Sequence, residues 1–135
     1  MGATTRSALM SASVKDPKPQ YVRKKAAGKD SQSNGSLMRI TPLAVFVAGI
    51  EDEKLLEQIV KSEVSLTHSN TPVQEAAICY CLAIKTLINN PGNRALAYET
   101  AKYLRGFTHN RNWAIAHATK ELQEWFTVVE SASMV

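Results

Sequence analysis

A polar turn that leads directly into the longest apolar run of the chain is the first candidate for chemistry. It contains Ser31, Ser33, Asn34 and Gly35, and the apolar run follows it. An Asn-Gly pair tolerates positive φ, and the missing Cβ of Gly35 lets a ligand approach the main chain. If residues 36–48 are helical, the first N–H groups of that helix have no internal partners and face the turn. The pattern therefore indicates a binding loop at a helix start, which suits a phosphate.

The sequence contains no complete motif for a metal site, a serine nucleophile or a glycine-rich nucleotide-binding loop. His109, His117 and Glu121 are residue types that bind metals, and His117 and Glu121 are one helical turn apart. Because no third ligand is placed near them, a solvated helix face is favoured over a metal site. The sequence has no Gly-x-Ser-x-Gly nucleophile motif, no P-loop and no Gly-x-Gly-x-x-Gly loop. Taken alone, Asn34-Gly35 is compatible with a plain turn, and His68 with a plain loop histidine.

The segment before the polar turn is short and basic. Residues 4–14 can form a helix, and residues 16–30, rich in Pro, Lys and Gly, predict an exposed basic connection. Residues 1–29 hold seven basic side chains against one acidic side chain, within a net charge of +4 for the chain. Such an arm could attract nucleic acid or anionic lipid, but only Tyr21 supplies an aromatic ring. A solvated loop is therefore favoured, and we expect no nucleic-acid partner.

The apolar run after the turn predicts a helix buried between neighbours. Residues 37–48 are apolar almost all round, and Gly49 fits as the stop. Pro42 leaves two possibilities open. Either one helix runs from Ser36 with a bend at the proline, or a new helix begins there with Thr41 as its N-cap.

The rest of the chain also has helical periodicity. Residues 52–64 predict an amphipathic helix, and residues 65–70 a polar loop. Thr71 as N-cap, Pro72 and Gln74 then predict the start of a helix that runs to about residue 89. Its expected core stripe comprises Val73, Ala77, Tyr80, Cys81, Ile84, Leu87 and Ile88, and it is widened by Ala76, Leu82 and Ala83. A further helix is predicted to about residue 105 with Asn93 as its cap, and another over residues 113–128. With no convincing strand, the fold class is all-α.

Composition is compatible with one globular domain. The chain has 135 residues, 44% of them apolar, and no stretch approaches the roughly 20 apolar residues that a membrane helix needs, so no membrane partner is expected. Cys79 and Cys81 are two apart on a predicted helix, so they point to different sides and cannot pair with each other. Buried thiols in a reducing compartment follow. We expect a cytoplasmic protein, with the nucleus or an organelle left open.

Three segments, in order, carry a family resemblance. Residues 33–43 read Ser-Asn-Gly-Ser-Leu-Met-Arg-Ile-Thr-Pro-Leu, and residues 2–9 read Gly-Ala-Thr-Thr-Arg-Ser-Ala-Leu. Further on, Leu-Thr-His-Ser-Asn at residues 66–70 is followed by Glu-Ala-Ala at residues 75–77. Together these segments resemble the middle of the ADP-ribosylglycohydrolase family, over about residues 2 to 90.

The resemblance implies a multi-helix orthogonal bundle and a hydrolase that cleaves the glycosidic bond of ADP-ribosylated substrates. In the complete family domain two magnesium ions are held by an early Asp-Asp-Thr-like motif and a late Gly-Gly-Asp-x-Asp-Thr-like motif. Neither motif is present in these 135 residues. We therefore expect residues 1–135 to be a partial, incomplete domain that binds no magnesium and hydrolyses nothing on its own. No catalytic residue and no metal ligand is assigned.

The same resemblance implies which residues contact ADP-ribose. Ser31, Ser33, Asn34 and Gly35 match a loop that lies against this ligand, although Ser33 stands where a Gly is common. Thr67 and His68 match a facing loop, where an imidazole can donate to a phosphate or ribose oxygen. Two other functions stay open: a non-catalytic relative that binds ligand or is structural, as the crystallin members are, and a small basic helical interaction protein.

Overall fold

The described part of the chain is helical. The computed structural model describes residues 2–10, 30–102, 124, 127–128 and 131–132. Its helices are α1 (Ala3–Met10), the 3-10 helix η1 (Leu37–Arg39), α3 (Thr41–Val47), α4 (Glu53–Val64), α5 (Thr71–Asn89) and α6 (Arg94–Lys102). The predicted all-α fold is therefore confirmed.

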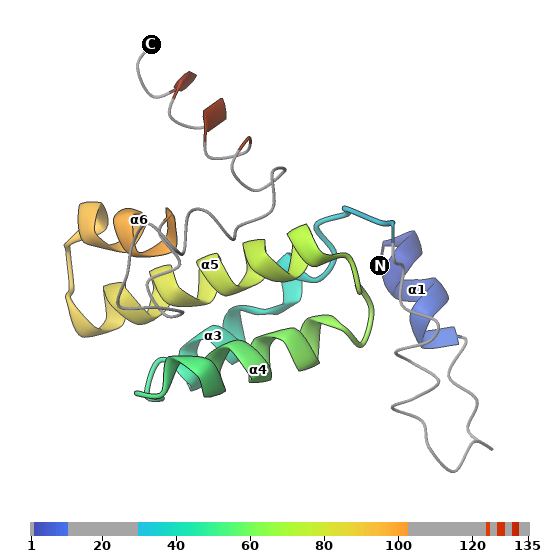
Figure 1. Cartoon of the computed structure of the whole chain (residues 1–135). Helices are drawn as coiled ribbons and strands as arrows, with labels where there is room; N and C mark the ends of the chain where they lie inside the picture. Colours follow the sequence, from blue (N-terminus) through green and yellow to red (C-terminus); the bar gives the residue numbers. More distant parts are fainter. Residues whose placement is uncertain (1, 11–29, 103–123, 125–126, 129–130, 133–135) are drawn as a thin grey trace.

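Helix α5 is the centre of the bundle. It packs against α3, α4 and α6, while α1 stands at one end of the bundle (Figure 1). The core contains Ile40, Ala44, Val47, Leu56, Val60, Val64, Val73, Ala77, Ile78, Cys79, Cys81, Leu82 and Ala101. The predicted stripe of α5 missed Ile78 and Cys79, which are buried, and wrongly included Ile88, which is exposed. Neighbours on several sides bury more of α5 than one stripe.

The region around Pro42 follows the second possibility, because a new helix begins there, but its N-cap was predicted wrongly by one residue. Instead of one bent helix, η1 and α3 are separate, and the N-cap of α3 is Ile40, whose side chain makes no capping hydrogen bond. Thr41 is not the cap, and its hydroxyl lies 2.9 Å from the hydroxyl of Tyr80 on α5. Because Pro42 has no N–H, it fits the first turn of α3, where no helical partner is needed.

Helix α3 is also less buried than expected. Val45 and Phe46 of α3 are exposed, at 56% and 70%, and so is Met38 of the preceding η1. Ala44 and Val47 are fully buried on the side that packs against α5. The prediction of burial on all sides was wrong, because among the described helices α5 covers one side of α3.

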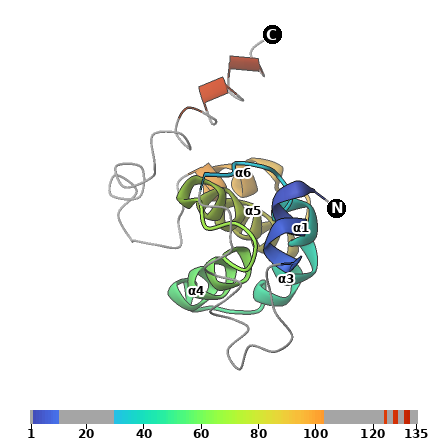
Figure 2. The same cartoon turned by 90° about the vertical axis from the view of Figure 1, so that its right-hand side faces the viewer.

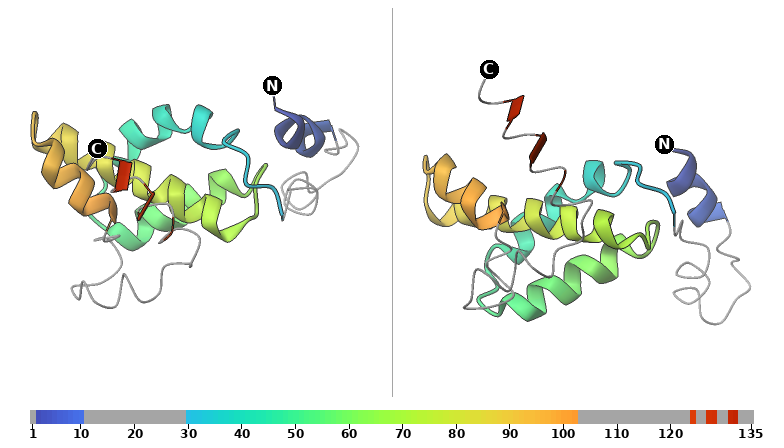
Figure 3. Two further views of the ribbon diagram at one scale, coloured as in Figure 1. Left: turned by 90° about the horizontal axis from the view of Figure 1, so that it is seen from above. Right: turned by 45° about the horizontal axis from the view of Figure 1, so that its top comes forward.

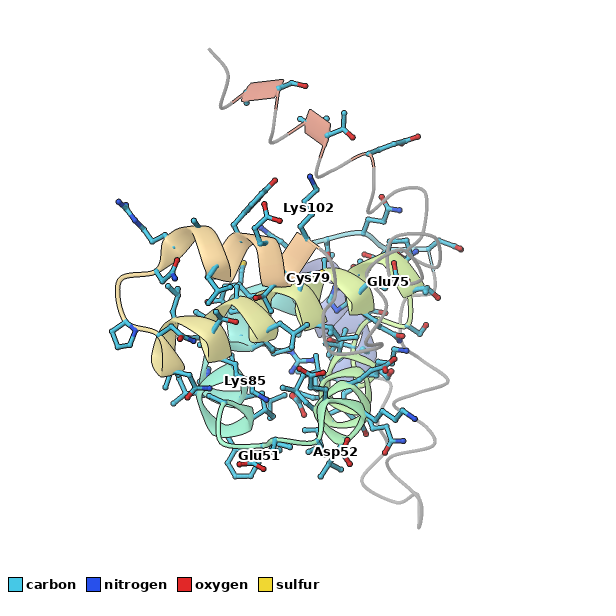
Figure 4. All side chains as sticks on the ribbon, turned by 60° about the vertical axis from the view of Figure 1, so that its left-hand side comes forward. Glu51, Asp52, Glu75, Cys79, Lys85 and Lys102 are labelled. Carbon is cyan, nitrogen blue, oxygen red and sulfur yellow. The ribbon has the colours of Figure 1, made fainter. Side chains whose placement is uncertain are left out.

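Side-chain caps stabilise the first turns of α4, α5 and α6. Asp52 Oδ1 accepts hydrogen bonds from Lys54 N (3.0 Å) and Leu55 N (3.2 Å) at the start of α4. Asn93 Oδ1 accepts from Leu96 N (3.0 Å) before α6, so the predicted cap there is confirmed. Between them, Lys85 of α5 donates to the carbonyl of Ile50, which ties α5 to the connection that contains Glu51 and Asp52 (Figure 4).

The predicted cap of α5 was wrong by one residue. Asn70, not Thr71, has extended backbone angles (φ −69°, ψ 125°), and its side chain accepts from Val73 N. The extended backbone lets the short amide fold back onto the first turn, as an N-cap requires. Gln74 does not close a capping box, because its Nε2 donates to Ser65 Oγ at 3.1 Å.

Several predicted features lie outside the described residues. They are the basic connection apart from Asp30, most of the helix predicted over 113–128, and His109, His117 and Glu121. Across the described helices, none has the length and apolar character that spanning a membrane requires.

Candidate functional site

The polar turn and the histidine loop meet in space. Ser33 and His68 are 35 residues apart, yet Ser33 Oγ lies 2.8 Å from His68 Nε2. Helix α1 lies beside them, at the end of the bundle where residues 30–36 and the start of α5 come together (Figures 2 and 3). Sequence segments from the chain start, from before η1 and from after α4 therefore form one site.

The end of α4 places the histidine. Beyond Val64 the chain continues in turns, with Thr67 N and His68 N both donating to the Val64 carbonyl, at 3.1 and 2.8 Å. Two residues later Asn70 caps α5. The loop is thus held at both ends by helices, which fixes the imidazole relative to the bundle.

The start of η1 places the polar turn. Met38 N donates to the Asn34 carbonyl at 3.0 Å, and Arg39 N to the Ser36 carbonyl at 3.3 Å. The long helix whose free N–H groups would face the turn is therefore not formed here. Asn34 is exposed, so its side chain is accessible on this face.

Gly35 is needed for packing within the protein. A Cβ at this position would lie 2.8 Å from Thr5 Oγ1 and 3.3 Å from His68 Cε1. Among the described glycines only Gly92 has positive φ (83°), so the positive φ expected at Asn34-Gly35 is not the reason for this glycine. The reason is the close approach of α1 and the imidazole.

Three hydroxyl groups form a ring around the turn. Thr4 Oγ1 lies 2.7 Å from Ser31 Oγ, Ser31 Oγ lies 3.3 Å from Ser33 Oγ, and Ser33 Oγ lies 3.5 Å from Thr4 Oγ1. Ser33 N also donates to Ser31 Oγ at 3.4 Å. The ring joins α1 to the polar turn and ends on His68 through Ser33.

On its other side the imidazole contacts Thr67, which an arginine holds in place. His68 Nδ1 lies 2.8 Å from Thr67 Oγ1, and Arg39 Nη2 donates to the same Thr67 oxygen at 2.9 Å. Arg39 Nη2 also donates to the Glu63 carbonyl (3.0 Å), and Nη1 pairs with the Glu63 carboxylate. The guanidinium therefore fixes the Thr67 hydroxyl against the end of α4.

His68 is buried, and its surroundings favour the neutral imidazole. Its exposed fraction is 0%, and that of Thr67 is 3%. Burial, and after it the charge of Arg39, lower the pKa of His68 below its ordinary value of 6.5. A neutral imidazole beside a serine resembles half of a nucleophilic dyad, but the second nitrogen contacts a threonine hydroxyl and no carboxylate. The arrangement is suited to hydrogen bonding with an oxygen-rich ligand.

The described residues do not fit a pair of magnesium ions. No group of three or more His, Cys, Asp or Glu residues among them could hold a metal ion. Three acids of α4 and its cap have other partners: Glu63 pairs with Arg39, Glu57 with Lys61, and Asp52 caps α4.

The two cysteines are free and buried on α5. Burial, and secondarily Glu75 one turn earlier, raise the pKa of Cys79, and burial raises that of Cys81 to about 12 (Figure 4). Both remain thiols near neutral pH, which fits the buried thiols that the sequence predicted and excludes a thiolate nucleophile at these positions.

Sequence reasoning missed part of the site. It placed Ser31, Ser33, Asn34, Gly35, Thr67 and His68 together, but it did not include Thr4 and Thr5. Thr4 contacts Ser31, and Thr5 lies against Gly35 beside the imidazole. It also did not identify the contacts of Arg39 with Glu63 and Thr67. A basic residue in an otherwise apolar stretch was the available signal.

Among the described residues, the chain is a helical bundle with a polar cluster around His68 at one end. A family model described as ADP-ribosylglycohydrolase matches residues 1–134. No curated protein and no solved structure shows a significant match. The chain belongs to the ADP-ribosylglycohydrolase family.

Proposed function

We propose that this chain contains the ADP-ribose-binding part of an ADP-ribosylglycohydrolase. The ligand is ADP-ribose or an ADP-ribosylated substrate, whose glycosidic bond the complete domain hydrolyses. Family membership supports the ligand class. The observation that carries the proposal is the 2.8 Å contact between Ser33 Oγ and His68 Nε2, which joins the two loops assigned to this ligand.

The accessible part of the site receives the ligand first. Ser33 and Asn34 are exposed, whereas Ser31 and Gly35 are half-buried and His68 lies beneath them. Hydroxyl and amide groups can both donate to and accept from phosphate and ribose oxygens. We therefore assign first contact to Ser33 and Asn34. A ligand oxygen reaches His68 Nε2 where it takes the place of the Ser33 hydroxyl.

Calorimetric titration of ADP-ribose into the full chain, with and without magnesium, tests the proposal. Asn34→Ala should weaken binding about 10- to 100-fold, because a hydrogen bond to a charged group contributes roughly 1.5–3 kcal/mol. Asn89→Ala is the matched control. It removes an equally exposed amide at the far end of α5, about 27 Å from its start.

Two results of the titration would refute the proposal. One is the absence of binding heat from the wild-type chain. The other is equal affinity of the wild type, Asn34→Ala and Asn89→Ala. A lower affinity confined to Asn34→Ala supports the assigned loop.

The second candidate is a relative that binds the ligand without hydrolysing it. The pairing of Glu63 with Arg39 favours it, since the carboxylate nearest to the Thr67–His68 loop in this network already has a protein partner. It predicts binding in the same titration, with affinity that does not change when magnesium is added. The hydrolytic candidate requires metal ligands beyond the described residues, and magnesium should then strengthen binding.

A further inference from the structure

The proton on His68 can be located by counting donors around it. Four hydrogen bonds join the hydroxyls of Thr4, Ser31 and Ser33 to one another and to His68 Nε2. Each hydroxyl carries one proton to donate. The contacts of Thr4 with Ser31 and of Ser33 with His68 are short, at 2.7 and 2.8 Å, and the other two are longer, at 3.3 and 3.5 Å. When all four are hydrogen bonds, three hydroxyl protons do not serve them, and the imidazole supplies the fourth. Nε2 is then the protonated nitrogen.

The contacts on the Nδ1 side of the imidazole indicate the same tautomer independently. Arginine is a donor only, so the Thr67 oxygen accepts the 2.9 Å bond from Arg39 Nη2. Thr67 is 3% exposed, and its own proton needs an acceptor inside the protein. His68 Nδ1, at 2.8 Å, provides this acceptor when it is unprotonated. A proton on Nδ1 would instead leave the buried Thr67 proton without that acceptor.

From these two observations we infer that Thr67, oriented by Arg39, is a positioning residue that holds His68 in the tautomer with its proton on Nε2. The imidazole is thereby a fixed hydrogen-bond donor aimed at the position that the Ser33 hydroxyl occupies. It is not a base that could take the Ser33 proton. Glu63 belongs to the same device, because its carboxylate and carbonyl hold the guanidinium.

The protonated Nε2 of His68 determines which kind of ligand atom binds beside it. A neutral N–H donor favours an acceptor oxygen, such as a phosphate or ribose oxygen, over a donor group. That part of the inference rests on the proposed function. The location of the proton does not, because it follows from the contacts of the free chain.

Nitrogen-15 NMR of the full chain tests the inference without any ligand. Long-range correlation spectra distinguish a protonated from an unprotonated ring nitrogen. Replacing His109 and His117 by glutamine leaves His68 as the only histidine, so that its signals are assigned directly. We expect the proton on Nε2. A proton on Nδ1 would overturn the inference, whereas a failed ADP-ribose titration would overturn only the proposed function.

Three variants test the role of Thr67. Thr67→Val removes the hydroxyl and should shift the tautomer equilibrium about fivefold toward Nδ1–H, which corresponds to the loss of one ordinary hydrogen bond. Thr67→Ser keeps the hydroxyl and should restore the wild-type ratio. Ser33→Ala removes the exposed hydroxyl that contacts Nε2 of the imidazole. It should leave the proton on Nε2, because Thr67 still donates to Nδ1.

Each outcome of these variants decides the role of Thr67. A wild-type ratio in Thr67→Val would show that the hydroxyl does not set the tautomer. A proton that moves to Nδ1 in Ser33→Ala would assign the control to the hydroxyl ring and likewise overturn the inference. If Thr67→Val fails to fold, Thr67→Ser and Ser33→Ala carry the test.

Discussion

Replacement of Gly35 by alanine should loosen α1 from the rest of the chain. The new Cβ would lie 2.8 Å from Thr5 Oγ1 and 3.3 Å from His68 Cε1, and the first of these distances is shorter than real Cβ contacts. The imidazole is held on both nitrogens, so it has little freedom to give way. Thr5 belongs to α1, which stands at the end of the bundle, and so α1 should move (Figure 3).

The size of the effect follows from what this movement breaks. Thr4 of α1 makes the 2.7 Å bond to Ser31 and the 3.5 Å bond from Ser33, and each such bond contributes about 1 kcal/mol. Overpacking a well-filled position costs about 1–3 kcal/mol. We therefore expect α1 to be destabilised locally by about 1–3 kcal/mol, while the α5 bundle keeps its core.

Hydrogen exchange measures this local effect directly. Amides of α1 should exchange about 5- to 100-fold faster in Gly35→Ala than in the wild type. Gly49→Ala is the matched control, because a Cβ there meets nothing within 4 Å, and it should leave α1 unchanged. Wild-type exchange rates for α1 in Gly35→Ala would refute the proposed contact between this glycine, Thr5 and the imidazole.

Three more predictions follow from capping, titration and burial. Asn70→Ala should lower the free energy of unfolding by about 1 kcal/mol, and Thr71→Ala by less than about half of that, measured by urea denaturation. Because the folded-state pKa of His68 is lowered, the unfolded chain binds more protons, so the free energy of unfolding should fall as pH drops below about 6.5. His68→Gln should remove this part of the pH dependence. Cys79 and Cys81 should react slowly with a thiol reagent at pH 8 and rapidly in denaturant, because the raised pKa of each keeps it a thiol; fast reaction in the native chain would contradict their burial.

Local sequence signals predicted much of the fold. The end of α5 near residue 89 and the cap at Asn93 were right, because turn and cap residues act within a few positions of themselves. The exposed side of α3 was not predictable in this way. An apolar run such as residues 41–47 gives the same pattern whether one neighbour or several cover it, so Phe46 was expected to be buried.

The N-cap of α5 shows how close a local prediction can come and still fail. Asn70 and Thr71 are both good cap residues, and Pro72 fits either of the first two helical positions. The choice was made by the backbone of the incoming loop, which leaves α4 in turns and reaches Asn70 in an extended conformation. That path depends on where α4 and α5 pack, which residue types alone do not specify.

The candidate site has the same limit in a sharper form. A threonine followed by a histidine is compatible with either tautomer of the imidazole, since the hydroxyl can donate or accept. The choice is made by Arg39, 28 residues before Thr67, which can only donate, and by Thr67, whose proton then has His68 Nδ1 as its acceptor. Both partners come from segments that the fold brings together. The chemistry of His68 is therefore a property of the packed bundle, and a variant at Arg39 should alter it while the sequence of the histidine loop is unchanged.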